Sequence, residues 1–261
     1  MDLPIDFNTD AVIALAQEAG KKILRIYSQG FDVYKKADKS PLTEADLQSH
    51  KTIIEGLSQI TPGISVLSEE SSKDEISNRL SWETYWLIDP LDGTKEFVKR
   101  NGEFTVNIAL IHKHEPVFGV VHAPVIEVTY WGGRGVGSHK IENNKSNVIH
   151  IRKRPSDTAE WKIVGSRSHQ SDEFRSYIET YSAAEIISMG SSLKLCLVAE
   201  GAADLYPRLG LTSEWDTAAA QAVVEAAGGH VLRVPEMEPL KYNNNESSLL
   251  NPYFLVCGDA L

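Results

Sequence analysis

Apolar residues recur at helical spacing in the N-terminal part of the chain. Within residues 9–27 they return every three or four positions, which is the period of one buried helical face. Residues 43–60 show the same period and follow a Ser-Pro pair at 40–41 that is typical of a loop. Short β-rich runs come next, with Gly or Pro between them. They predict an antiparallel sheet with strands at 64–67, 85–88, 104–111, 117–122 and 128–131.

A polar segment follows these predicted strands. Residues 140–156 hold a cluster of asparagines at 143, 144 and 147, which predicts a surface loop near a domain boundary. Strands and helices are then expected to alternate, with two short strands at the end. The expected elements are strand 161–164, helix 172–181, strand 185–189, helix 193–200 and helix 217–227, which ends at Gly228-Gly229. The pattern predicts an α+β fold with an N-terminal α+β domain at 1–154 and a smaller α/β domain at 155–261.

Composition and charge narrow the classes of function. The 261 residues are 42% hydrophobic and 24% charged, ordinary values for a globular protein. The formal net charge of −10 argues against nucleic acid as a partner, because phosphate backbones attract basic surfaces. An acidic protein still binds a small anion when metal ions lie between the two.

The cysteines and the N-terminus point to a reducing compartment. Cys196 and Cys257 lie in apolar surroundings and are expected to be buried and reduced, too few for a disulfide framework or a zinc site. The acidic N-terminus lacks the basic and apolar regions of a signal peptide, and no apolar run reaches the length of a membrane span. We expect a cytoplasmic protein, with peripheral association with the inner membrane left open.

A turn rich in carboxylates follows the predicted strand 85–88. The segment 89–94 reads DPLDGT, in which Pro90 fixes the backbone and Gly93 permits a tight turn. On such a turn the side chains of Asp89 and Asp92 can converge, and oxygen ligands suit Mg²⁺, Mn²⁺ or Ca²⁺. An ordinary Asp-Pro and Asp-Gly turn explains the bare spacing equally well.

Three other acidic segments bear on this choice. Glu69 and Glu70 end another apolar run, where solvated loop charge is the simpler interpretation for the pair alone. Asp216 precedes an alanine-rich stretch and fits a helix N-cap, a role that does not exclude metal binding. Asp46 fits the third helical position of a capping box that begins at Thr43.

In combination, these segments resemble the signatures of the inositol monophosphatase superfamily. SEE at 68–70, WLIDPLDGT at 86–94 and WDTAA at 215–219 occur in the order and at the spacing of that superfamily, and the similarity extends over nearly the whole chain. Within the superfamily, DGTKEF at 92–97, KRNGEFTVN at 99–107 and GSSLK at 190–194 resemble the 3′(2′),5′-bisphosphate nucleotidases.

The resemblance implies a layered α/β/α/β/α sandwich with Mg²⁺ ions between two subdomains. It implies two or three Mg²⁺ ions, for which Mn²⁺ may substitute. Carried over residue by residue, the metal ligands would be Glu69, Asp89, the carbonyl of Leu91, Asp92 and Asp216. Asp46 and Thr94 would hold and activate the attacking water, and Glu70 would contact a more weakly bound metal.

The activity implied is hydrolysis of a phosphate monoester. The expected substrate is adenosine 3′,5′-bisphosphate, converted to AMP and phosphate in the nucleotide recycling of sulfur assimilation. Paired metals clamp the attacking and leaving oxygens of such a displacement. Thr94 needs an adjacent carboxylate, such as Asp46, to take up the proton of the water. The oligomeric state is left undetermined.

The expected substrate contacts lie on both halves of the chain. Inositol phosphatases of the superfamily carry a glutamate before the Trp-Asp motif, whereas this chain has Arg208 near that position, which suits a second phosphate. Lys194 on its own is better explained as a solvated helix residue, and a polar surface loop explains His169 equally well. The complete set is Gly93, Thr94, Ser166, His169, Ser191, Ser192, Lys194 and Arg208.

Three rival functions fit parts of this pattern. An inositol monophosphatase or sugar-bisphosphate phosphatase is the nearest alternative, and Arg208 and Lys194 weigh against the former. A non-catalytic phosphonucleotide sensor has no need of the pair Asp46 and Thr94. A calcium-binding structural module would hold its acids within one loop, not spread between Glu69 and Asp216.

Overall fold

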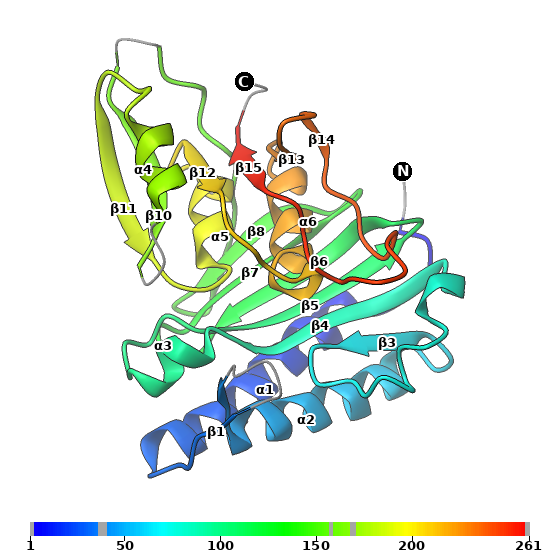
Figure 1. Cartoon of the computed structure of the whole chain (residues 1–261). Helices are drawn as coiled ribbons and strands as arrows, with labels where there is room; N and C mark the ends of the chain where they lie inside the picture. The colour runs from blue at the N-terminus through cyan, green and yellow to red at the C-terminus, as the bar shows by residue number, and fades with distance from the viewer. Residues whose placement is uncertain (1–2, 36–40, 157–158, 168–170, 259–261) are drawn as a thin grey trace.

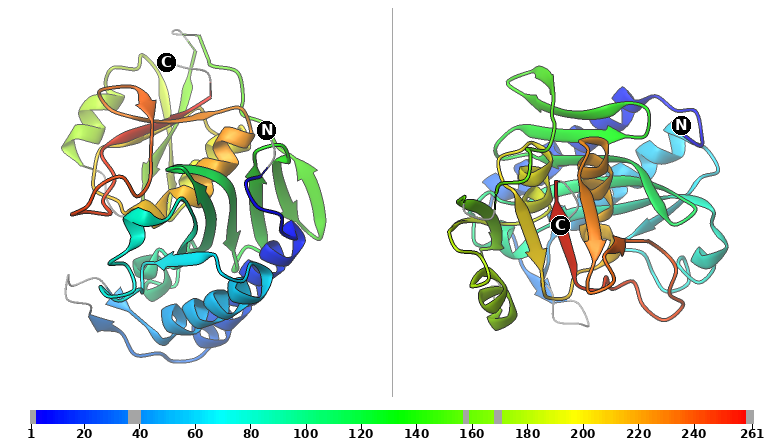
Figure 2. Two further views of the ribbon diagram at one scale, coloured as in Figure 1. Left: turned by 90° about the vertical axis from the view of Figure 1, so that its right-hand side faces the viewer. Right: turned by 90° about the horizontal axis from the view of Figure 1, so that it is seen from above.

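A computed structural model of the chain describes residues 3–35, 41–156, 159–167 and 171–258. The described elements form five layers, as the superfamily resemblance implies (Figure 1). A helix pair covers one face of a seven-stranded sheet, two helices fill the space between this sheet and a six-stranded sheet, and one helix covers the far side. Figure 2 shows α6 between the two sheets from the side.

The first layer is the helix pair α1 (Thr9–Ser28) and α2 (Glu44–Ile60), which confirms both predicted helices. The side chain of Asn8 accepts a hydrogen bond from the Ala11 N–H and so caps α1. Thr43 and Asp46 form the predicted capping box of α2. Both helices bury their apolar stripe against the sheet, in a core that also contains Trp86.

The larger sheet has the order β3-β4-β5-β6-β7-β8-β9. One prediction about it was wrong, because β3 pairs with β4 in parallel and not antiparallel. Residues 69–83 form a crossover that returns the chain to the starting end of β3. The strands are β3 (Ser65–Ser68), β4 (Thr84–Asp92), β5 (Thr105–His112), β6 (Glu115–Ala123), β7 (Val128–Gly133), β8 (Gly137–Glu142) and β9 (Lys145–Val148).

The expectation of a loop at 140–156 was also wrong in part. β8 and β9 form a hairpin at the edge of the sheet, and Asn143 and Asn144 make its turn in left-handed conformation, with φ of 52° and 59°. Such a turn matches the twist of a hairpin. β9 is exposed throughout, so it shows no apolar alternation from which a strand could be predicted.

The C-terminal half alternates as predicted. Its sheet has the order β11-β10-β12-β15-β13-β14, with β10 parallel to both of its neighbours. The strand β12 was not predicted. The elements are β10 (Trp161–Ser166), α4 (Asp172–Ile178), β11 (Ala184–Met189), α5 (Leu193–Ala199), β12 (Leu205–Arg208), α6 (Ala218–Ala226), β13 (His230–Arg233), β14 (Glu238–Pro239) and β15 (Phe254–Cys257).

The remaining elements are short and lie in connections. A two-stranded ribbon precedes α2, and single helical turns flank the acidic segments. They are β1 (Tyr34–Lys35), β2 (Pro41–Leu42), η1 (Arg79–Ser81), α3 (Thr94–Val98) and η2 (Glu214–Asp216). No helix within the described ranges is long and apolar enough to cross a membrane.

Both halves contribute to one shared core. α6 lies so close to β6 that a Cβ atom on Gly119 would come within 2.1 Å of the Ala219 carbonyl oxygen, so only glycine fits there. Cys196 and Cys257 are both buried, as expected. We propose that the two domains divide between residues 154 and 155, because β9 ends before this point, β10 begins after it, and each half contains one large sheet.

Candidate active site

Parallel pairing brings two acidic strand ends together. Ser68 of β3 lies opposite Ile88 of β4, and the Glu69 N–H donates to the Ile88 carbonyl at 3.2 Å. Glu69 therefore follows its strand at the level of Asp89. A register shift between Asp89 and Asp92 bends the end of β4, and Gly93 then takes a φ of 91° to begin α3. Because of this bend, both aspartates line the same cavity.

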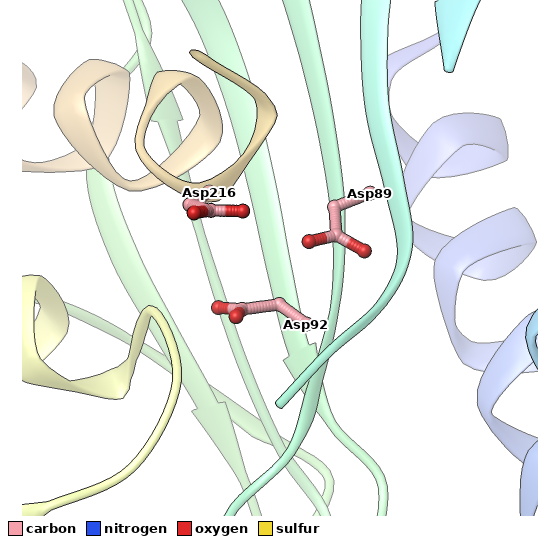
Figure 3. A group of neighbouring side chains, drawn as sticks. All are labelled: Asp89, Asp92 and Asp216. Carbon is pink, nitrogen blue, oxygen red and sulfur yellow. The ribbon is translucent and has the colours of Figure 1, made fainter. Parts of the chain in front are cut away.

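Asp216 completes the acidic group from the other half of the chain. It lies on η2, immediately before α6, and its carboxylate accepts a hydrogen bond from the Ser213 N–H at 2.9 Å. Figure 3 shows its carboxylate facing those of Asp89 and Asp92. One oxygen from each of these three side chains lies within 4.8 Å of the others. An all-oxygen set of this kind suits a hard divalent cation.

Burial and the repulsion between neighbouring carboxylates raise the pKa of two of these side chains. Burial, followed by the negative charges of Glu69, Asp92 and Asp216, raises the pKa of Asp89 well above its ordinary value. Burial and then the charge of Asp92 raise the pKa of Asp216 to about 8. A divalent cation among these oxygens would relieve both the burial penalty and the repulsion. The donor set therefore fits Mg²⁺.

Ser192 holds Asp92 in place. The backbone N–H and the hydroxyl of Ser192 both donate to Asp92 Oδ2 at 2.6 Å, and the hydroxyl oxygen is 2.9 Å from the Asp216 carbonyl. Asn107 Nδ2 donates to the Ser192 hydroxyl at 2.6 Å. We predicted a substrate contact for Ser192, yet its side chain is buried among these partners and is not part of the cavity lining.

The side chains of Asp46 on α2 and Thr94 on α3 lie close together, as the resemblance implies. The Thr94 hydroxyl lies 3.3 Å from Asp46 Oδ1 and 3.3 Å from the Leu91 carbonyl oxygen. The other oxygen of Asp46 accepts hydrogen bonds from the Thr43 N–H at 2.8 Å and the Thr43 hydroxyl at 2.6 Å. The helix cap thus orients a buried carboxylate toward Thr94.

Two cations, Lys194 and Arg208, line the same cavity as the acidic group. Its volume is about 270 Å³, and its lining also includes Gly93, Ser166 and Ser191, three of the residues for which substrate contacts are predicted. Lys194 Nζ donates to the Ser191 carbonyl at 2.5 Å, and burial lowers the pKa of Lys194. Arg208 lines the same cavity. Its Nε is buried and has no hydrogen-bond partner among the described residues.

The cavity lining differs from the predicted set of site residues at several positions. Glu70 is not among the lining residues, and His169 lies outside the described residues. Lys95, Glu96 and Tyr206 line the cavity without having been predicted, although all three lie within motifs that carried the resemblance or the substrate assignment.

Arg167 follows the predicted substrate contact Ser166, and its side chain is engaged by a carboxylate. Arg167 makes two hydrogen bonds of 2.7 Å to the carboxylate of Glu103. Glu103 also accepts the Gly190 N–H at 2.8 Å, so Arg167 braces the turn before Ser191.

One cavity brings together acidic strand ends, a hydroxyl–carboxylate pair and two cations. On a layered sandwich, this arrangement is typical of metal-dependent phosphatases. The family model described as "Inositol monophosphatase family" matches residues 6–253. The chain belongs to this family.

Individual relatives agree with this assignment. The chain is 48% identical over 250 residues to the 3′(2′),5′-bisphosphate nucleotidase CysQ of Escherichia coli strain K12, covering 95% of this chain and 98% of that protein. It is 38% identical to the protein of the same name from Haemophilus influenzae, covering 95% and 91%. The crystal structure of CysQ from Bacteroides thetaiotaomicron matches with a TM-score of 0.84 and 42% identity, over 95% of this chain and 96% of that one.

The metal-free protein is expected to lose stability as the pH rises. Burial raises the pKa of Asp216 from 3.8 to about 8, so the folded state keeps a proton that the unfolded state releases in this range. Ionisation there favours unfolding. We predict that the Tm in EDTA falls between pH 5 and pH 8, and that Mg²⁺ offsets the fall.

Asp216→Asn should flatten this pH dependence in EDTA. Asp172→Asn serves as the control, because the Asp172 side chain is 96% exposed, and it should leave the profile unchanged. A wild-type Tm that responds to pH equally with EDTA and with Mg²⁺ would contradict the account.

Proposed function

We propose that the protein hydrolyses the 3′-phosphate of adenosine 3′,5′-bisphosphate to give AMP and inorganic phosphate. The observation that carries this proposal is that the Asp89–Asp92–Asp216 group and the two cations Lys194 and Arg208 line one cavity. The CysQ relatives are 3′(2′),5′-bisphosphate nucleotidases, in agreement with this arrangement.

Mg²⁺ is the cation that the acidic residues of the cavity would hold. Asp89, Asp92, Asp216 and Glu69 would supply carboxylate oxygens, and Leu91 its carbonyl oxygen. When bound, two or three Mg²⁺ ions, or Mn²⁺ in their place, would offset the charge of the phosphate and lower the pKa of water. The acidic protein then becomes compatible with an anionic substrate.

The protein's own groups manage the proton of the attacking water. Thr94 Oγ1 would accept this proton while passing its own to Asp46 Oδ1, 3.3 Å away. The new bond joins the water oxygen to phosphorus, and the bond from phosphorus to the 3′ oxygen breaks. The departing 3′ oxygen takes a proton from solvent and becomes the 3′ hydroxyl of AMP. Burial of Asp46, which is 1% exposed, keeps its carboxylate directed at Thr94.

The two cations Lys194 and Arg208 favour a substrate with a second phosphate. An arginine offers a planar set of donors that matches phosphate oxygens. Arg208 Nη2 donates to the Leu211 carbonyl at 2.8 Å, and its buried Nε has no hydrogen-bond partner among the described residues. Lys194 adds a second positive charge. A site with such donors discriminates against substrates that leave them unpaired.

A neighbouring pocket supports a nucleoside over an inositol ring. It has a volume of about 440 Å³ and shares Ser166, Tyr206 and Arg208 with the first cavity. Phe174, Pro207 and Leu209 give it an apolar wall, which suits a flat base better than a ring of hydroxyls.

Asp92→Asn should remove most of the Mg²⁺-dependent phosphate release while the protein stays folded. Loss of one carboxylate weakens the metal set, yet Ser192 can still hydrogen-bond to the amide oxygen. Phosphate release from adenosine 3′,5′-bisphosphate measures the effect, with Asp172→Asn as the matched control. Near-normal turnover by Asp92→Asn would overturn the proposed site.

Arg208→Gln should separate recognition of two phosphates from recognition of one. We expect kcat/KM for adenosine 3′,5′-bisphosphate to fall roughly 10- to 100-fold, the worth of charge-assisted hydrogen bonds, with little change for adenosine 3′-monophosphate. Arg175→Gln on α4, where Arg175 is 66% exposed, provides the control. Equal losses with both substrates, or faster wild-type hydrolysis of inositol 1-phosphate, would contradict the assignment of Arg208.

A further inference from the structure

Arg79 is a buried arginine that does not line the cavity. It lies on η1, within the crossover that begins at Glu69, and it is 5% exposed. Its Nη1 donates to the side-chain oxygen of Asn243 at 2.5 Å, and its Nη2 donates to the Asn245 carbonyl at 2.5 Å. Burial of an arginine is costly unless its donors are satisfied, so these contacts fix its partner segment closely.

Asn243 connects Arg79 with the turn that carries Asp216. Its side-chain nitrogen donates back to the Arg79 carbonyl at 2.6 Å. Its backbone N–H donates to both carboxylate oxygens of Glu214, at 2.9 and 2.8 Å. Asn243 is fully buried and Glu214 is 3% exposed. The connection therefore runs from the Glu69 crossover, through Asn243, to a position two residues before Asp216.

The same stretch of chain holds the Asp216 turn at other points. Residues 242–251, here called the clasp, lie between β14 and β15, where the chain descends from the smaller sheet to the larger one and returns (Figure 1). The Tyr242 hydroxyl lies 3.0 Å from Thr217 Oγ1. Asn251 Nδ2 donates to the Ser213 carbonyl at 2.8 Å and to Thr217 Oγ1 at 3.0 Å. The clasp thus contacts residues on both sides of Asp216.

We propose that Arg79, Asn243 and Glu214 are positioning residues that set the affinity for Mg²⁺. They fix the Asp216 turn relative to the crossover that carries Glu69, so that acids from the two halves of the chain meet at one point. None of the three lines the cavity, so they act only through the residues they hold. The inference rests on the metal site of the proposed function.

Two substitutions break the connection from opposite ends. Asn243→Gly keeps the left-handed backbone, where φ is 53°, and the N–H bond to Glu214, but it removes both bonds to Arg79. Arg79→Leu removes the guanidinium. Each should raise the Kd for Mg²⁺ roughly tenfold or more, as loss of groups that orient metal ligands does. Isothermal titration calorimetry of the full chain with MgCl₂ measures the Kd directly.

Further readouts separate positioning from mere stability. The Mg²⁺ concentration for half-maximal phosphate release should rise by the same factor, with kcat at saturating Mg²⁺ close to wild type. The loss of Mg²⁺ affinity in the double variant should be smaller than the sum of the two single losses, because both substitutions remove the bond from Arg79 Nη1 to the Asn243 side-chain oxygen. Arg79→Lys keeps the positive charge but loses the planar guanidinium, so it should raise the Kd for Mg²⁺ by a smaller factor. This variant tests the proposal if Arg79→Leu does not fold.

Arg152→Leu is the matched control. It breaks a 3.0 Å contact between Arg152 Nε and the buried Asp204 carboxylate, and neither residue lines the cavity. It should lower the Tm without changing the Kd for Mg²⁺. If the Arg79 and Asn243 variants behave like this control, the positioning role is overturned and the proposed function stands. If the wild-type chain itself does not bind Mg²⁺, both are overturned.

Discussion

The mutual repulsion of buried carboxylates is the constraint on which the rest of the structure depends. Asp89, Asp92 and Asp216 hold oxygens within 4.8 Å of one another, and burial makes the negative charges of Asp89 and Asp216 costly. The fold offsets part of this cost with directed donors. Ser192 donates twice to Asp92, and the Ser213 N–H donates to Asp216. The remaining charge is what a divalent cation neutralises, and it is the property that makes this cavity a site for phosphate chemistry.

The layered sandwich solves a geometric problem that no single segment can solve. Asp89 and Asp92 lie at the end of a strand in one sheet, whereas Asp216 precedes the helix α6 between the two sheets. Close contact of α6 with Gly119 of β6 sets the separation of these layers. The cavity between them is lined by acids from both halves of the chain and by the cations Lys194 and Arg208 from the second half.

The sequence predicted what depends on local pattern and short motifs. Both N-terminal helices, the Asp46 cap and the alternating second half follow from spacing and capping chemistry. Parallel pairing of β3 was missed because strand direction depends on a crossover with no pattern of its own. The contact of Ser192 with Asp92 joins positions 100 residues apart, and that of Arg79 with Asn243 joins positions 164 apart. No local signal marks such pairs, so only the folded structure reveals them.

The most direct test of the central claim is a crystal structure of the full chain with Mn²⁺, located by anomalous diffraction. Mn²⁺ takes the same oxygen ligands as Mg²⁺ and can be identified by its scattering. The account predicts an anomalous peak bound by carboxylate oxygens of Asp89, Asp92 and Asp216. A peak at a different acidic cluster, or an Mn²⁺ ion that contacts Asp89 and Asp92 but not Asp216, would contradict a metal site shared by the two halves of the chain.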